Sequence, residues 1–180
     1  MRSVGAPGIA RRAGRALVVG SLALIPNFAL LAAADALGIV TARGGFQRLV
    51  KLWTGPHLEA LGIAAWWRAT SLPDPNGPVF TDGFKIAVGL GMALVYAIIE
   101  PRLPGRPLVK GFVYAALVYL LNAALVLPLL GEGFAGIRSL TPVGIVAFAI
   151  AHTAFFLTLA SLYGAMPRSQ PSRSGSSVRT

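Results

Sequence analysis

Four long apolar segments run along this chain, separated by shorter segments that hold most of its charged residues. Their uncharged parts are Ala16–Ala34, Ile86–Ile99, Gly111–Gly131 and Pro142–Met166. A bilayer hydrocarbon core about 30 Å thick needs about 20 apolar helical residues to cross it. The pattern therefore predicts an all-α bundle of four membrane-spanning helices, at about residues 16–41, 84–100, 110–131 and 142–166. Thr141 suits the N-cap of the last span, and Pro142 suits its first helical position.

Residues 56–69, between the first two spans, predict a further helix that lies on the outer membrane surface. Pro56 suits a first helical position, and four apolar residues fall near one helical face: Leu58, Leu61, Ala65 and Trp66. Because tryptophan prefers the headgroup level, we expect this interfacial helix to be anchored by Trp53, Trp66 and Trp67. The following sequence, SLPDPNGPVFTDG, is rich in turn-forming residues and predicts a loop.

The composition also indicates a membrane protein. Hydrophobic residues make up 55% of the chain and charged residues 12%, whereas soluble domains carry about 25% charged residues. The mean hydropathy is +0.69. A water-soluble fold of 180 residues could not bury this much apolar surface, so we expect one domain integral to a membrane. The absence of cysteine excludes disulfides, thiolate metal sites and thiol nucleophiles.

The basic residues predict the orientation. The net charge is +10, but the basic residues flank apolar segments and form no basic face, so we expect no nucleic-acid partner. Residues 1–15 hold four of them, the turn at 100–110 holds three and residues 167–180 hold three, whereas the loop before the last span holds only Arg138. The segment 43–85 holds five, but long segments are translocated largely regardless of charge. We therefore expect a multi-pass protein of the bacterial inner membrane with both termini cytoplasmic. The basic segment 1–15 is expected to be a tail, and the serine-rich segment 167–180 a disordered one.

The first apolar segment has an alternative interpretation as a cleaved signal peptide. Its basic lead, apolar run and small residues near Ala34 have the order of such a peptide. However, the run is long for a signal peptide and continues past Asp35 as ALGIVTA. Cleavage would also leave three spans and place the two tails on opposite sides. A retained span is the interpretation that we adopt.

Three strong hydrogen-bonding side chains fall at one depth in the predicted spans. Counting 1.5 Å per residue from the start of each apolar run places Asn27, Asn122 and His152 about 15–17 Å into a layer about 30 Å thick. One interpretation is a polar site for a proton, a solute headgroup or a pigment metal. The other is that these residues hydrogen-bond across helices, with Asn122 the expected partner of His152. Such contacts contribute about 0.6 kcal/mol in membranes.

His152 could also be the single axial ligand of a haem or a chlorin. A bis-histidine haem needs a second intramembrane histidine, and the other histidine of the chain, His57, lies in the outer segment. We therefore predict no cofactor and no metal site beyond this single-histidine alternative.

Asp35 and Lys85 are charged residues at adjoining ends of the first two spans. Asp35 closes the first span on the outer side, and Lys85 opens the second span on the same side. An ion pair between them would lower the cost of holding both charges near hydrocarbon. The alternative is that each side chain extends to water separately.

Small residues predict where the helices pack. Gly89, Ala93 and Ala97 recur every four residues on the second span, and Gly111 and Ala115 do so on the third. Small residues at this spacing let a neighbouring helix approach closely. We expect these five positions to form helix–helix contacts.

Motifs of catalysis are absent from the sequence. There is no serine elbow, no HExxH motif and no pair of intramembrane carboxylates, and the chain has only six acidic residues. We therefore predict no catalytic residues and a protein that is not an enzyme.

The segment from Phe84 to Gly164 resembles small, uncharacterised four-helix bacterial inner-membrane proteins of the YagU-like group. The residues that carry the resemblance are Gly89, Gly91, Tyr96, Lys110, Gly111, Pro128, Gly133, Phe134, Gly136, His152, Tyr163 and Gly164. The chain departs from that pattern because its second span lacks a histidine. The resemblance implies a four-helix membrane fold and no specific activity.

These observations lead to three functional hypotheses. The first is a non-catalytic accessory or assembly subunit that packs into a larger membrane complex with other membrane-protein subunits. The second is a small transporter or proton path through the layer of Asn27, Asn122 and His152. The third is a pigment- or haem-binding protein that uses His152.

Overall fold

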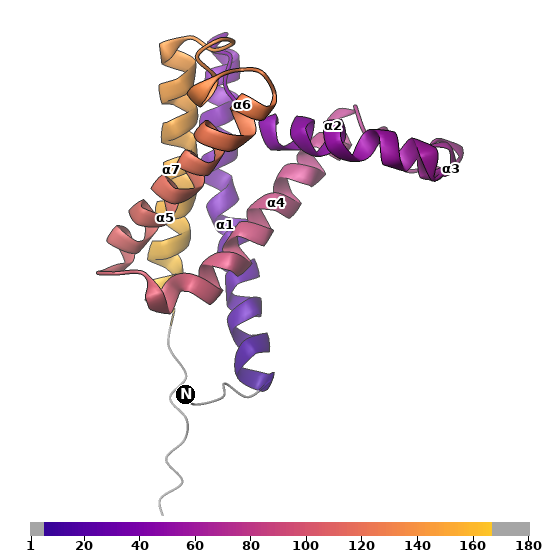
Figure 1. Ribbon diagram of the computed structural model, residues 1–180. Coiled ribbons are helices and arrows are strands. Elements are labelled where there is room, and N and C mark those ends of the chain that lie inside the picture. The colour runs from indigo at the N-terminus through magenta and orange to yellow at the C-terminus, as the bar shows by residue number, and fades with distance from the viewer. Residues whose placement is uncertain (1–5, 167–180) are drawn as a thin grey trace, which may run out of the picture.

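The computed structural model describes residues 6–166 as an all-α fold (Figure 1). The helices are α1 (Ala6–Ala36), α2 (Gly45–Ala60), α3 (Ile63–Ala69), α4 (Pro78–Ile99), α5 (Pro107–Leu121), α6 (Leu127–Leu129) and α7 (Pro142–Ala165). A π-helical turn, Asn122–Val126, joins α5 to α6, and short 3-10 turns occur at Glu100–Arg102 and Phe134–Gly136. No strand occurs in this part of the chain.

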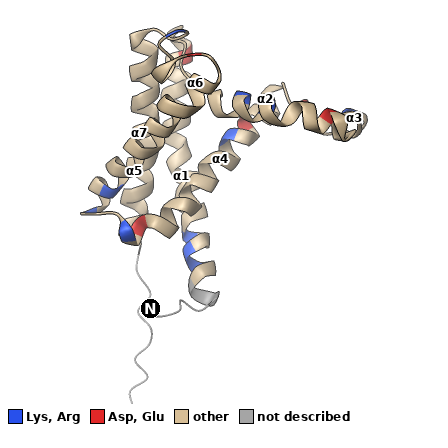
Figure 2. Ribbon diagram, viewed as in Figure 1, with Lys and Arg blue, Asp and Glu red and all other residues tan. Residues whose placement is uncertain are grey.

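Four of the helical segments are long and apolar enough to cross a bilayer: Ile9–Ala36, Pro78–Arg102, Pro107–Leu129 and Pro142–Ala165. Large apolar side chains on their outer faces, such as Val18, Ile98 and Val146, are exposed and suit contact with lipid. Figure 2 shows that charged residues lie toward the ends of these segments and on α2 and α3. The prediction of a multi-pass, all-α membrane bundle is thus confirmed.

The ends of the first span differ from the prediction. Helix α1 begins at Ala6, so residues 6–15 of the predicted basic tail are helical and continuous with the first span. It ends at Ala36 because Gly38 adopts φ 69°, a left-handed conformation that ends a helix. The amide of Ile39 then donates to the carbonyl of Ala34 at 2.9 Å. The predicted disordered tail at 167–180 lies outside the described residues, as do residues 1–5.

The segment between the first two spans is more helical than predicted. Instead of one helix that starts at Pro56, the chain forms α2 and α3, with Pro56 inside α2. Left-handed glycines explain both boundaries, since Gly44 (φ 81°) precedes α2 and Gly62 (φ 71°) separates α2 from α3. Part of the predicted loop also belongs to α4, which begins at Pro78. Proline is favoured at the first helical position because no intrahelical hydrogen bond needs its missing N–H.

The spans pack in the order α4–α1–α7–α5. Helix α1 contacts both α4 and α7, and α7 contacts α5 over its length. Helices α4 and α5 diverge toward the end of the bundle where α2 begins (Figure 1). We call this end the arm end, and the opposite end, where α1 begins and α7 ends, the tail end.

Aromatic rings hold α4, α5 and α7 together toward the tail end. The ring of Tyr96 lies 5.6 Å from that of Tyr114 and 5.7 Å from that of Tyr163, between centroids. The Tyr114 hydroxyl donates to the carbonyl of Met92 at 3.1 Å. The largely buried Lys110 ammonium lies 2.6 Å from the Glu100 carboxylate, which also joins α5 to the end of α4. These contacts fix α4 to α5 at one end only.

The five small residues selected from the sequence are all buried between spans. A methyl group on Gly89 would lie 2.7 Å from Leu24 of α1, and one on Gly20 would lie 2.7 Å from Ala93. On α5, a methyl group on Gly111 would lie 2.9 Å from the Phe156 carbonyl oxygen. The stripe on α4 therefore faces α1, and Gly111 faces α7.

The ends of α7 are capped by polar contacts. The Thr141 hydroxyl accepts a hydrogen bond from the Gly144 amide at 3.1 Å, which confirms the predicted N-cap. At the tail end, the Arg15 guanidinium of α1 donates to the carbonyls of Tyr163 and Met166 at 2.7 and 3.1 Å. A cation is stabilised there by the carbonyls at the helix C-terminus.

Helices α2 and α3 form an arm that extends sideways from the bundle (Figure 1). Only the first turns of α2 are buried, at Gly45, Gln47 and Leu49. The arm contacts the loop before α4 and the first turn of α4, since the Trp67 indole N–H donates to the Pro73 carbonyl at 3.0 Å and its ring contacts Phe80 edge-on. This orientation across the bundle suits helices at a membrane interface.

Candidate functional site

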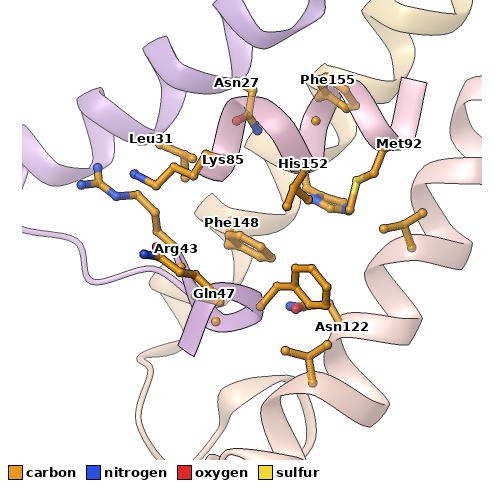
Figure 3. Close-up of a pocket in the computed structure, with 18 of the residues that line it drawn as sticks. Asn27, Leu31, Arg43, Gln47, Lys85, Met92, Asn122, Phe148, His152 and Phe155 are labelled. Carbon is orange, nitrogen blue, oxygen red and sulfur yellow. The ribbon is translucent and has the colours of Figure 1, made fainter. Parts of the chain in front are cut away.

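A cavity of about 280 Å³ lies where α4 and α5 diverge (Figure 3). Residues of α1, α4, α5, the π-helical turn and α7 form its walls, and the first residues of α2 cover its arm end. Most lining side chains are apolar, including Leu24, Val88, Met92, Phe148 and Phe155. The cavity exists because the divergence of α4 and α5 leaves space that these side chains do not fill.

The structure brings the three polar residues of the predicted layer to this one cavity. Asn27, Asn122 and His152 all line it, from three different elements. At about 1.5 Å per residue, each lies about 10–15 Å from the arm end of its span. They therefore share one level inside the hydrocarbon layer, nearer the arm end than counting from the apolar runs suggests.

The predicted hydrogen bond between His152 and Asn122 does not form. The Asn122 Nδ2 and His152 Nε2 atoms are buried and have no partner, whereas Asn27 Nδ2 donates to the Ala151 carbonyl at 2.9 Å. The imidazole is held by rings instead, with its centroid 5.5 Å from that of Phe148 and 4.9 Å from that of Phe156.

Two unpartnered nitrogen atoms beside one cavity are energetically costly. A buried donor or acceptor without a hydrogen bond costs about 1–3 kcal/mol, and native proteins contain few of them. Both atoms are covered by protein, so a molecule in the cavity does not reach them without a movement of side chains. The cavity is a candidate binding site because of its volume and its mainly apolar lining.

The charged residues at the cavity edge form pairs that differ from the predicted one. Asp35 pairs with Arg43, and Lys85 pairs with Asp82 at 2.8 Å, so the predicted pair of Asp35 with Lys85 does not form. Both actual partners are close in sequence: Asp82 is one helical turn before Lys85, and the turn after α1 brings Arg43 back to Asp35. The two cations that line the cavity, Arg43 and Lys85 (Figure 3), are thus each balanced by a carboxylate.

The rim of the cavity holds apolar and charged side chains. Leu121 of α5 and Phe46 of α2 line the cavity and are also 57% and 46% exposed. The exposed Arg43 lines it as well. These residues lie where the cavity meets the surroundings, between α5 and the start of α2.

The cavity offers a haem or a chlorin a single histidine ligand, His152. His57 is exposed on α2 and does not line it. The described residues contain no group of three or more His, Cys, Asp or Glu side chains that could hold a metal ion. A volume of about 280 Å³ is also below the 300–1,000 Å³ of pockets for drug-sized ligands. A macrocycle would have to push α4 and α5 further apart.

The predicted interface anchors lie on the arm. Trp53 and Trp66 are 57% and 60% exposed, and Trp67 is half-buried against Phe80. Because α2 and α3 are separate helices, the predicted apolar face of one continuous helix does not form. The exposed residues are distributed over both helices instead.

Sequence reasoning missed the contribution of α2 to the cavity. Gln47 is buried beside it and donates to the Thr81 hydroxyl at 3.3 Å, and Arg43 and Phe46 also line it. The available signal was an uncharged polar residue, Gln47, two positions after the Gly44–Gly45 pair, in a segment otherwise assigned to the surface.

The cavity lining offers amide, imidazole and cationic groups, and no carboxylate is among the described residues that form it. The geometry and sequence are the basis for a functional assignment, because comparison with protein-family models, with curated proteins and with solved structures finds no match.

Proposed function

We propose that this chain is a non-catalytic accessory or assembly subunit of a larger complex in the bacterial inner membrane. The observation that carries the proposal is the arm. Its large apolar side chains, which include Leu52, Trp53, Leu61 and Trp66, are exposed, although the first turns of α2 and the ring of Trp67 contact the bundle. Exposed aromatic residues are enriched where proteins bind one another. The arm thus offers a surface for a neighbouring membrane protein at headgroup level.

The orientation that we propose places the tail end in the cytoplasm. The contact of Arg15 with the end of α7 shows that the first and last spans meet at this end. The described residues hold six basic residues at the tail end and six at the arm end and on the arm, so the proposal rests on the two short connections: the turn at residues 100–110 holds three basic residues, and the loop before α7 holds only Arg138. Basic residues in short loops favour the cytoplasmic side. The arm then lies on the outer surface.

Purification from native membranes tests the accessory role. The full chain would be isolated in mild detergent, and co-purifying proteins would be quantified by mass spectrometry. We expect stoichiometric membrane-protein partners that are lost from a Trp53→Ala/Trp66→Ala variant. The matched control is Leu117→Ala/Ile150→Ala, which changes two equally exposed residues on spans. Isolation of the protein without partners would contradict the proposal.

A second candidate function is a small transporter or proton path. The observation that favours it is the convergence of Asn27, Asn122 and His152 on one cavity. A path to the tail end would have to pass the packed rings of Tyr96 and Tyr114. This function predicts that His152→Ala abolishes flux in proteoliposomes without unfolding the protein, and normal flux in that variant would reject it. An absorption spectrum of the purified chain, with and without His152, tests the pigment alternative.

A further inference from the structure

We infer that the turn between α4 and α5 is a binding site for an anionic phospholipid, with the guanidinium groups of Arg102 and Arg106 on the lipid phosphate. The inference goes beyond the accessory role and does not depend on it, because it concerns the tail end and not the arm. Three features support it: the uneven charge of the two ends, the fixed turn that carries the two arginines, and the apolar faces that lead to them.

The two ends of the bundle differ in charge although they hold equal numbers of basic residues. Among the described residues, the tail end has six basic residues and one carboxylate, that of Glu100. The arm end and the arm together have six basic residues and five carboxylates. With histidine neutral, the described part of the tail end thus has an excess of five positive charges, and the arm end and arm have an excess of one. An anionic ligand is attracted to the tail end.

Most basic side chains of the arm end and the arm already have a partner within the protein. Four of the six pair with carboxylates, as Arg43–Asp35, Arg48–Glu132, Arg68–Glu59 and Lys85–Asp82. Lys51 donates to the Pro75 carbonyl. These cations therefore serve contacts inside the fold and are less suited to hold a lipid.

The α4–α5 turn is held in place by contacts on both of its sides. Leu103 packs against the buried core of the bundle. The Lys110 ammonium donates to the carbonyl and to the carboxylate of Glu100, at 3.0 and 2.6 Å. The single carboxylate beside the turn is thus balanced by a cation, and the backbone that carries the arginines is fixed before a ligand binds.

Arg102 and Arg106 flank Leu103–Gly105 in this turn, and both are exposed. Neither takes part in the ion pairs found among the described residues. Arg102 has one long contact with the Ile98 carbonyl, at 3.4 Å. A guanidinium carries a planar fork of N–H donors that matches the oxygen atoms of a phosphate. Two such groups on one short turn can therefore bind one phosphate together.

The apolar surface beside the turn favours a lipid over an acidic protein. Ile98 lies one helical turn before Arg102 on α4, and Leu108 and Phe112 follow Arg106 on α5; all three are exposed. The acyl chains of a phospholipid would lie along these faces while its phosphate meets the arginines at their end. An anionic lipid is favoured over a zwitterionic one, because the cationic group of a zwitterionic headgroup offsets the attraction. Each basic side chain near the membrane surface strengthens binding of anionic lipid about fivefold.

Lipid binding by the full chain in detergent micelles tests the inference. Dissociation constants would be measured by native mass spectrometry for phosphatidylglycerol, which is anionic, and for phosphatidylcholine with the same acyl chains, which is zwitterionic. We expect tighter binding of phosphatidylglycerol, with a preference that falls as the salt concentration rises, because salt screens exposed charges. Glycerol 3-phosphate, which has the phosphate without acyl chains, should not displace the lipid.

Four double variants locate the site. Arg102→Gln/Arg106→Gln should weaken phosphatidylglycerol binding about ten- to thirtyfold and leave phosphatidylcholine binding unchanged. Arg102→Lys/Arg106→Lys keeps both charges and should retain most of the binding. Arg11→Gln/Arg12→Gln removes the same charge from the same end and should weaken binding less, because these exposed arginines lie on α1. Arg68→Gln/Arg138→Gln removes two exposed arginines from the arm and the arm end, and should change neither constant.

Four results would overturn the inference. Equal affinity for the two lipids would show that no anionic-lipid site exists. A greater loss in Arg11→Gln/Arg12→Gln than in Arg102→Gln/Arg106→Gln would place the site on α1. Displacement by glycerol 3-phosphate would indicate a site for free phosphate esters. An acidic protein that is lost from Arg102→Gln/Arg106→Gln, without any lipid preference in the parent, would assign the arginines to a protein contact. Circular dichroism of each variant distinguishes these results from loss of folding, and none of them bears on partner capture by the arm.

Discussion

The contact between α5 and α7 depends on Gly111, and Gly111→Ala is the substitution that tests it most directly. A methyl group at this position would lie 2.9 Å from the Ala160 Cβ, 2.9 Å from the Phe156 carbonyl oxygen and 3.2 Å from the Leu157 Cα. Two of these atoms belong to the backbone of α7, so they cannot move by side-chain rotation. The two helices would have to separate.

The expected loss of stability follows from two opposing terms. Overpacking costs about 1–3 kcal/mol, whereas replacing glycine by alanine within a helix gains about 0.5–1 kcal/mol. Gly91→Ala on α4 is the matched control, because a methyl group there meets no atom within 4 Å. It should show the gain alone. The difference between the two variants therefore isolates the overlap, and the backbone contacts of Gly111 place it toward the upper part of about 1–3 kcal/mol.

Reversible unfolding by sodium dodecyl sulfate in mixed micelles, followed by far-ultraviolet circular dichroism, measures both free energies. A Gly111→Ala/Ala160→Gly double variant should recover only part of the loss, because it removes the methyl–methyl contact and leaves the contact with Phe156. Equal stabilities of Gly111→Ala and Gly91→Ala would refute the close packing of α5 on α7.

Three further predictions concern single polar residues, and the same unfolding assay measures each of them. Asn122→Leu should stabilise the ligand-free protein by about 1–3 kcal/mol, because it removes a buried donor that has no partner; destabilisation would show that the amide is satisfied. Arg15→Met should cost about 1.5–3 kcal/mol through lost hydrogen bonds to the end of α7, with Arg15→Lys recovering part of the loss; a variant as stable as the parent would rule this out. Thr141→Val should cost about 0.5–2 kcal/mol by removing the N-cap of α7, and no change would mean that water replaces the hydroxyl.

The apolar segments were sufficient to predict the four spans, because each is long enough to cross the bilayer and every backbone group in lipid must be satisfied within a helix. The N-cap at Thr141 could also be predicted from the sequence, because the hydroxyl and the Gly144 amide that donates to it are only three residues apart. Structural features that depend only on neighbours within a few residues can therefore be predicted from the sequence.

The contacts of the candidate site were not accessible to the same reasoning. Residue counting gave Asn122 and His152 a similar depth, but a hydrogen bond also requires the two side chains to face each other, and here they form none. Asp35 pairs with Arg43 because the chain turns back at the left-handed Gly38. A hydropathy pattern does not reveal that backbone conformation. The contribution of α2 to the cavity depends in the same way on the left-handed Gly44.

Helices α4 and α5 are in direct contact with each other at the tail end of the bundle and separate toward the arm end. Tyr114 and Lys110 hold the two helices at the tail end, while at the arm end the cavity separates them. At the arm end α2 contacts both sides of the cavity. Phe46 packs on Phe84 of α4 at 6.0 Å between ring centroids, and Arg48 pairs with Glu132, which follows α6, at 2.5 Å. A change in the angle between α4 and α5 would therefore have to shift or break one of these contacts of α2. The space between the two helices and the position of the arm are coupled through α2.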